Sequence, residues 1–139
     1  MVNFNVINTN FRLKNKLKVR NWVRDIVASE ERLGGEISYI FCDDEYLGSV
    51  NEKYLKHHTL TDIVTFDYSE HGRIAGDIFI SVERVHENSA IFKTTLSEEL
   101  ARVMAHGILH LVGYKDKSKD DSKIMRSKED LYLASFPNL

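Results

Sequence analysis

The sequence has 139 residues, of which 42% are hydrophobic and 29% are charged, and its formal net charge is −2. This composition excludes a disordered chain, and the charge balance excludes a wholly basic protein that coats nucleic acid, although a local basic surface is compatible with it. No apolar stretch approaches the ~20 residues of a membrane span, and residues 1–10 lack the pattern of a secretory signal, so we expect a cytoplasmic protein without a membrane partner. A single cysteine, Cys42, excludes an internal disulfide and fits a reducing compartment.

The first half of the chain predicts two strands, each followed by a helix. Apolar and polar residues alternate over residues 2–6, which indicates a half-buried strand. Apolar residues at helical spacing predict a helix over residues 13–33, ended by Gly34 and Gly35. A β-rich run predicts a strand over residues 37–42, and Asp43 or Asp44 then begins a helix that runs to about Leu55.

The second half predicts a hairpin followed by three helices. Residues 63–66 and 76–81 are strand candidates, and the short polar loop between them favours antiparallel pairing. Helices are expected over residues 82–93, over about 97–112 with Thr95 or Ser97 as the cap and Gly113 as the end, and over 120–135. This order predicts an α+β fold in a single domain, residues 1–139, with about five helices packed on a small mixed sheet of about four strands. We expect the first strand–helix–strand unit to be a right-handed parallel crossover.

The helix expected over residues 97–112 carries two histidines near its C-terminal end. Residues 103–112 read VMAHGILHLV, in which His106 and His110 are the polar side chains. Residues four apart share one helix face, so both imidazoles can converge on one ion, and Asp116 follows after a chain reversal at Gly113. The pattern H-x3-H-x2-G-x2-D therefore predicts a divalent metal site with two nitrogen ligands and one oxygen ligand, which leaves a position open for water, as in catalytic zinc sites. Two core histidines bonded to the backbone, with Asp116 as a loop acid, remain the alternative.

The spacing of the three ligands is also similar to that of the metzincin zinc proteases. Their motif begins His-Glu, but Gly107 occupies the position of the glutamate that acts as general base. A metallopeptidase-like hydrolase is therefore the second hypothesis. A glycine in mid-helix costs ~1 kcal/mol relative to alanine, so we expect Gly107 to permit tight packing or a close backbone approach.

Three segments resemble the YbeY family of single-strand-specific metallo-endoribonucleases. Residues 106–116, HGILHLVGYKD, match the motif H-G-x-L-H-L-x-G-Y-D-H; LTDIVTF at 60–66 is similar to P-T-D-V-L-S-F; and AGDIFIS at 75–81 is similar to L-G-D-I-x-I-S. The resemblance implies an endoribonuclease that acts in rRNA processing, at the 3′ end of 16S rRNA, and in ribosome quality control. It implies one divalent ion, zinc, held by His106, His110 and Asp116, with single-stranded RNA, rRNA and ribosomal particles as partners.

Two positions depart from the family pattern. The third metal ligand of the family is usually histidine, whereas here it is Asp116, which still suits zinc but shifts the preference slightly towards harder ions such as Mn²⁺. The family commonly has an arginine after the tyrosine that precedes the second motif, whereas Tyr54 is followed by Leu55. Lys56, His57 or His58 could supply the missing cation near the scissile phosphate. A ribosome-associated factor that is stabilised by metal but has no catalytic activity is the third hypothesis.

Other polar residues are weaker candidates for contact with the substrate. Glu99 lies two helical turns before His106 on the same face and could act as an acid or base beside the metal, although it also suits the first turn of its helix. The stretch between Arg12 and Arg24 carries cations without interspersed acids, among them Lys14, Lys16 and Lys18, which with Lys56 are candidates for contact with RNA phosphates. A solvated helix face is the alternative for this stretch. We take a monomer as the default oligomeric state.

Overall fold

The computed structural model describes residues 1–55 and 61–137 and confirms the α+β class. The elements in chain order are β1 (Val2–Ile7), α1 (Lys16–Ser29), β2 (Leu33–Cys42), α2 (Asp44–Leu55), β3 (Ile63–Asp67), β4 (Arg73–Ser81), α3 (Val82–Phe92), α4 (Leu96–Val112) and α5 (Lys119–Leu133). The sheet has the order β1-β2-β4-β3, in which β1, β2 and β4 are parallel and β3 is antiparallel to β4. The mixed sheet, the parallel β1–β2 pair and the β3–β4 hairpin are as predicted. Among the described residues, no helix combines the length and the apolar character that a membrane crossing requires.

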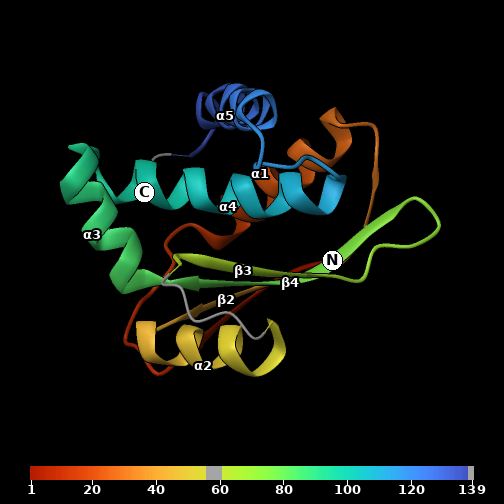
Figure 1. Cartoon of the computed structure of the whole chain (residues 1–139). Coiled ribbons are helices and arrows are strands. Elements are labelled where there is room, and N and C mark those ends of the chain that lie inside the picture. The colour runs from red at the N-terminus through yellow and green to blue at the C-terminus, as the bar shows by residue number, and fades with distance from the viewer. Residues whose placement is uncertain (56–60, 138–139) are drawn as a thin grey trace.

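The helices form layers on the sheet. Figure 1 shows α2 against one face of the sheet, α4 across the other face with α1 beside it, and α5 on the side of α4 away from the sheet. The alternation of side chains along β4 explains this arrangement, because Ile78 and Ile80 enter the large core with α1 and α4 whereas Phe79 packs on the small core beneath α2. Since α4 is covered on both sides, most of its residues are apolar and buried.

The bounds of α1 correct one prediction. The helix expected over residues 13–33 begins only at Lys16 and ends at Ser29. Leu17 fits the helical spacing but is 65% exposed, so its apolar character does not mark the buried face. The glycines that were expected to end this helix lie in β2, where the register with β4 shifts between Gly34 and Ile37. The chain instead reverses after α1 with Glu31 in the left-handed conformation, at φ 60°, which is uncommon for a residue other than glycine.

The start and end of α4 agree with the sequence signals. Thr95 is the cap, since its side-chain oxygen accepts a hydrogen bond from the Glu98 backbone N–H at 3.1 Å. Gly113 ends the helix, and its φ of 123° gives the chain the reversal that follows.

Candidate metal centre

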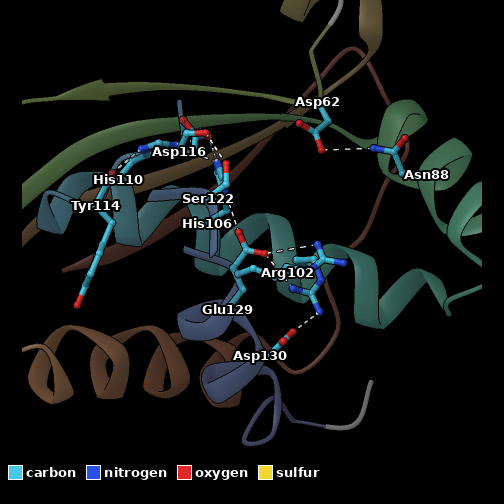
Figure 2. Close-up of polar contacts among 11 residues, drawn as sticks. Asp62, Asn88, Arg102, His106, His110, Tyr114, Asp116, Ser122, Glu129 and Asp130 are labelled. Carbon is cyan, nitrogen blue, oxygen red and sulfur yellow. Dashed lines mark hydrogen bonds and ion pairs between the residues drawn. The ribbon is translucent and has the colours of Figure 1, made fainter. Parts of the chain in front are cut away.

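The structure brings the three predicted ligands together. His106 and His110 lie one turn apart on α4, and the turn after Gly113 returns Asp116 to the same place (Figure 2). The two histidine Nε2 atoms are 2.9 Å apart, and the Asp116 Oδ2 atom lies 3.1 Å from the first and 3.2 Å from the second. For comparison, a tetrahedral zinc site with bonds of about 2.05 Å has ligand–ligand edges of about 3.3 Å. We call His106, His110 and Asp116 the triad.

The hydrogen bonds behind the triad decide which atoms face its centre. The His110 Nδ1 atom lies 3.0 Å from the Tyr114 carbonyl oxygen, which can only accept, so this nitrogen carries the proton. The His106 Nδ1 atom lies 2.6 Å from the Glu129 Oε2 atom and donates to that carboxylate. When both imidazoles are neutral, the two Nε2 atoms present lone pairs to each other and to the Asp116 carboxylate. Three acceptors without a proton between them repel one another, and a cation at their centre resolves this, so the residues fit a divalent ion.

A carboxylate that the sequence analysis missed orients His106. Glu129, on α5, is 4% exposed, and its second oxygen, Oε1, accepts a hydrogen bond from Arg102 at 2.9 Å. Arg102 also donates to Asp130 at 2.7 Å, so a chain of charged groups runs from α5 back to the imidazole (Figure 2). Burial lowers the pKa of His106, but the hydrogen bond to Glu129 and the neighbouring negative charges outweigh this and hold it above its usual range. One signal was present in the sequence: Glu129 shares the buried face of α5 with Met125 and Tyr132, where a carboxylate needs a partner.

The turn that carries Asp116 is anchored to α1 and α5 through one carboxylate. The Tyr114 hydroxyl donates to the Glu30 Oε1 atom at 2.6 Å, Lys128 donates to its Oε2 atom at 3.1 Å, and the Tyr132 hydroxyl donates to it as well. Burial raises the pKa of the Glu30 carboxyl, but these hydrogen bonds outweigh burial and keep it below its ordinary value. We call Glu30, Tyr114, Lys128 and Tyr132 the anchor cluster. The backbone carbonyl of Tyr114 also accepts the hydrogen bond from His110 Nδ1. The anchor cluster therefore fixes one side of the triad.

Replacing Glu129 by glutamine should weaken metal binding without removing a ligand. Because the amide is neutral, it stabilises a metal-bound imidazole less than a carboxylate does, and substitutions of this kind cost roughly 10- to 100-fold in metal affinity. A competition titration with a chromophoric chelator measures the dissociation constant. Asp130→Asn is the matched control. It neutralises the other carboxylate that pairs with Arg102, but Asp130 does not contact His106. An affinity of the Glu129→Gln variant equal to that of the control would show that Glu129 has no influence on the site.

The structure places the remaining predicted residues away from the triad or outside the described part of the chain. Glu99 is 5% exposed and lines a pocket together with His106, but its side chain makes no hydrogen bond with any residue in 1–55 or 61–137. Lys16 and Lys18 are exposed in the first turn of α1, and Lys14 is exposed just before that helix. Lys14 lies beside the first turns of α4, whereas the triad lies at its last turns, about 20 Å away at 1.5 Å per residue. Lys56, His57 and His58 lie outside the described residues, and nothing is described of the Leu55 side chain.

Comparison with known proteins places the chain in a family. The family model described as Endoribonuclease YbeY matches residues 5–137. The chain belongs to this family. The Endoribonuclease YbeY of Flavobacterium johnsoniae is 54% identical over 136 residues, which are 98% of this chain and 97% of that protein. The YbeY of Flavobacterium psychrophilum is 52% identical over 136 residues, 98% of this chain and 96% of that protein.

A solved structure extends the likeness to the fold. The solution structure of a Thermotoga maritima protein matches with a TM-score of 0.67 and 26% identity, and covers 98% of this chain and 89% of that one. The resemblance to the YbeY family noted in the sequence is thereby confirmed. The environment of Gly107 also counts against the metallopeptidase hypothesis. A Cβ atom at this position would meet Ile78 at 2.8 Å, so a glutamate there could not face the metal.

Proposed function

We propose that this protein is a metal-dependent endoribonuclease that cleaves single-stranded RNA at the triad. The observation that carries the proposal is the convergence of three acceptor atoms on one point at the surface of a protein of the YbeY family. The side chains of His106, His110 and Asp116 are 22%, 26% and 39% exposed, so substrate can reach that point. Membership in an endoribonuclease family supports RNA as the substrate.

The chain's own groups hold and orient the site. His106 and His110 would supply two nitrogen ligands, with Glu129 and the Tyr114 carbonyl fixing their tautomers, and Asp116 would supply the oxygen ligand. The chemistry that a divalent ion supplies at such a site is polarisation of a phosphoryl oxygen and a lowered pKa for a water molecule. Two imidazoles and one carboxylate suit zinc. Glu99 as an acid or base beside this site stays a prediction.

The cellular role that we propose follows from the family. We infer that the substrate is rRNA, at the 3′ end of 16S rRNA, in ribosomal particles in the cytoplasm, and that the enzyme also serves ribosome quality control. A three-ligand site with an open position supports catalysis over a purely structural role for the metal. The non-catalytic alternative predicts a protein that holds metal but does not cut RNA.

Removal and return of the metal tests the proposal. The purified protein is expected to hold about one ion per chain, to cut an unstructured RNA, and to leave the same strand intact when it is annealed to its complement. Dialysis against a chelator should abolish cleavage because the triad then lacks its cation, and added zinc should restore it. The measurements are metal content and gel-resolved cleavage, with Mn²⁺ and Mg²⁺ as comparisons. A protein that holds a full ion but cuts no single-stranded RNA would favour the non-catalytic factor.

Lys14, Lys16 and Lys18 are the residues we propose for contact with the RNA backbone beyond the site. The slope of log affinity against log salt concentration should flatten by about 0.7 for each phosphate contact that is lost in a single strand. The triple substitution to glutamine is compared with Lys53→Gln, an exposed lysine on α2 at the opposite face of the sheet. Equal slopes for the triple variant and the wild type would remove this surface from the proposal.

A further inference from the structure

A pocket opens beside the triad and shares one wall with it. Its volume is about 310 Å³, close to the smallest volumes typical of small-molecule sites. Figure 2 shows Asp62 and Asn88 on one side of this region, with Arg102 and Glu129 on the other. The lining residues come from the start of β3 and from α3, α4 and α5, and they include His106. A molecule bound at the triad could therefore extend into this pocket.

The wall of the pocket holds a carboxyl group that has no hydrogen-bond partner among the described residues. Glu99 is 5% exposed, and its side chain makes no hydrogen bond or ion pair within the described ranges 1–55 and 61–137. Burial raises the pKa of this carboxyl above its ordinary value, and the nearby charges of Arg102 and Arg126 offset only part of that rise. A ligand that brings hydrogen-bond donors into the pocket would satisfy this carboxyl group.

The rim of the pocket offers an aromatic ring and a cation. Phe92, the last residue of α3, is 62% exposed although it is large and apolar. Arg126, on α5, has a side chain that is 65% exposed, and its contact with Glu129 is loose, at 3.9 Å. Aromatic rings that stack on bases, combined with cations that follow the backbone, are the general means of binding single strands.

The position of the pocket along α4 relates it to the site of cleavage. Glu99 precedes His106 by seven residues, which is about 10 Å along a helix. The pocket thus lies next to the triad rather than over it. An RNA strand cut at the triad would place a neighbouring nucleotide in the pocket.

We propose that this pocket is a subsite for one unpaired nucleotide adjoining the bond that is cut. Its base stacks on Phe92, its phosphate pairs with Arg126, and its hydrogen-bond donors reach Glu99. The inference rests on the proposed ribonuclease function and adds a physical reason for the preference for single strands, since a base within a duplex is already stacked and cannot enter.

The test compares two adjacent exposed residues. Phe92 lines the pocket, whereas Ile91, which is 69% exposed, does not, so Phe92→Ala and Ile91→Ala remove similar apolar groups at different places. Loss of a base-stacking ring should raise KM for an unstructured RNA by roughly 5- to 100-fold with little change in kcat, and Ile91→Ala should match the wild type. Phe92→Trp should keep the wild-type KM. Metal content and Tm show whether each variant retains its site and fold.

A second measurement isolates the stacking contact. Abasic nucleotides are placed one at a time along the RNA, and binding is measured by fluorescence anisotropy on metal-stripped protein, so that cleavage does not interfere. Wild type should lose affinity at one position beside the cleavage site, and Phe92→Ala should lose nothing further at that position. If Phe92→Ala acted only by disturbing the structure, the variant would lose as much affinity at the abasic position as the wild type does.

The outcomes separate the subsite from the ribonuclease function. If the wild type cuts RNA and the KM of Phe92→Ala equals that of Ile91→Ala, the subsite proposal is wrong while the ribonuclease stands. If the wild type binds RNA with the abasic signature but does not cut it, the subsite stands and the ribonuclease function fails. If the wild type neither binds nor cuts single-stranded RNA, both proposals are overturned.

Discussion

Replacement of His110 by alanine is expected to abolish metal binding and to reduce RNA cleavage by about a thousandfold or more, while leaving the protein folded. The substitution removes one of three ligands, and two ligands alone do not hold a zinc ion in a tetrahedral site. The His110 side chain is 26% exposed, so its loss leaves little unfilled core. Metal content by mass spectrometry of the native protein and single-turnover cleavage rates give the two measurements.

His86→Ala is the matched control for this variant. His86 lies on α3 and is exposed, and it belongs to no group of potential metal ligands among the described residues. We expect wild-type metal content and wild-type cleavage for His86→Ala. If His110→Ala kept one ion per chain and wild-type activity, the triad would not be the metal centre.

A methyl group at Gly76 is expected to reduce the free energy of unfolding by about 3 kcal/mol or more. A Cβ atom there would lie 2.4 Å from the Phe66 carbonyl oxygen and 2.9 Å from a methyl group of Leu111. The first of these neighbours is backbone in the β3–β4 ladder, where Phe66 pairs with Asp77, so it cannot move aside without disturbing the hairpin. Small proteins are stable by only about 5–15 kcal/mol, so such a loss is a large fraction of the total.

Gly48→Ala is the control for the Gly76 variant, because it should raise the free energy of unfolding rather than lower it. Gly48 lies in α2, and a Cβ atom at this position meets nothing within 4 Å. Alanine is preferred to glycine inside a helix by up to about 1 kcal/mol, so the control should be more stable than the wild type. Denaturant unfolding of metal-free protein measures both variants. A Gly76→Ala variant that unfolds at the wild-type midpoint would contradict the close approach of α4 to the hairpin.

The triad could be predicted from the sequence because its geometry is local. His106 and His110 are one helical turn apart, and a single reversal at Gly113 returns the chain to them, so helix periodicity and one glycine suffice. Glu129 lies on a different helix, 23 residues after His106, and its contact depends on how α5 packs on α4. No spacing rule in a single sequence encodes that packing.

The contrast between local signals and packing also explains which bounds of the helices were predicted correctly. α4 begins after Thr95, one of the two caps that the sequence offered, and one residue before the predicted start near Ser97; its end at Gly113 was predicted. The end of α1 was not, because Glu31 adopts the left-handed conformation expected of a glycine. Leu17 fits the helical period but faces solvent, and only the packing of neighbouring elements decides such a case. Packing thus decided the case of Leu17, whereas α1 ends through local hydrogen bonds around Glu31 that no glycine marks in the sequence.

The anchor cluster joins residues that are far apart in the chain, so it can form only after α5 has been synthesised. Its carboxylate, Glu30, leaves the ribosome early, whereas its partners Lys128 and Tyr132 are among the last residues of the described chain to be synthesised. Glu129, which orients His106, arrives at the same late moment. A nascent chain that ends before α5 would already contain all three residues of the triad but would lack the groups that orient His106 and anchor the Asp116 turn. We therefore expect a chain shortened before α5 to have little capacity to cut RNA, even though it keeps every residue of the triad.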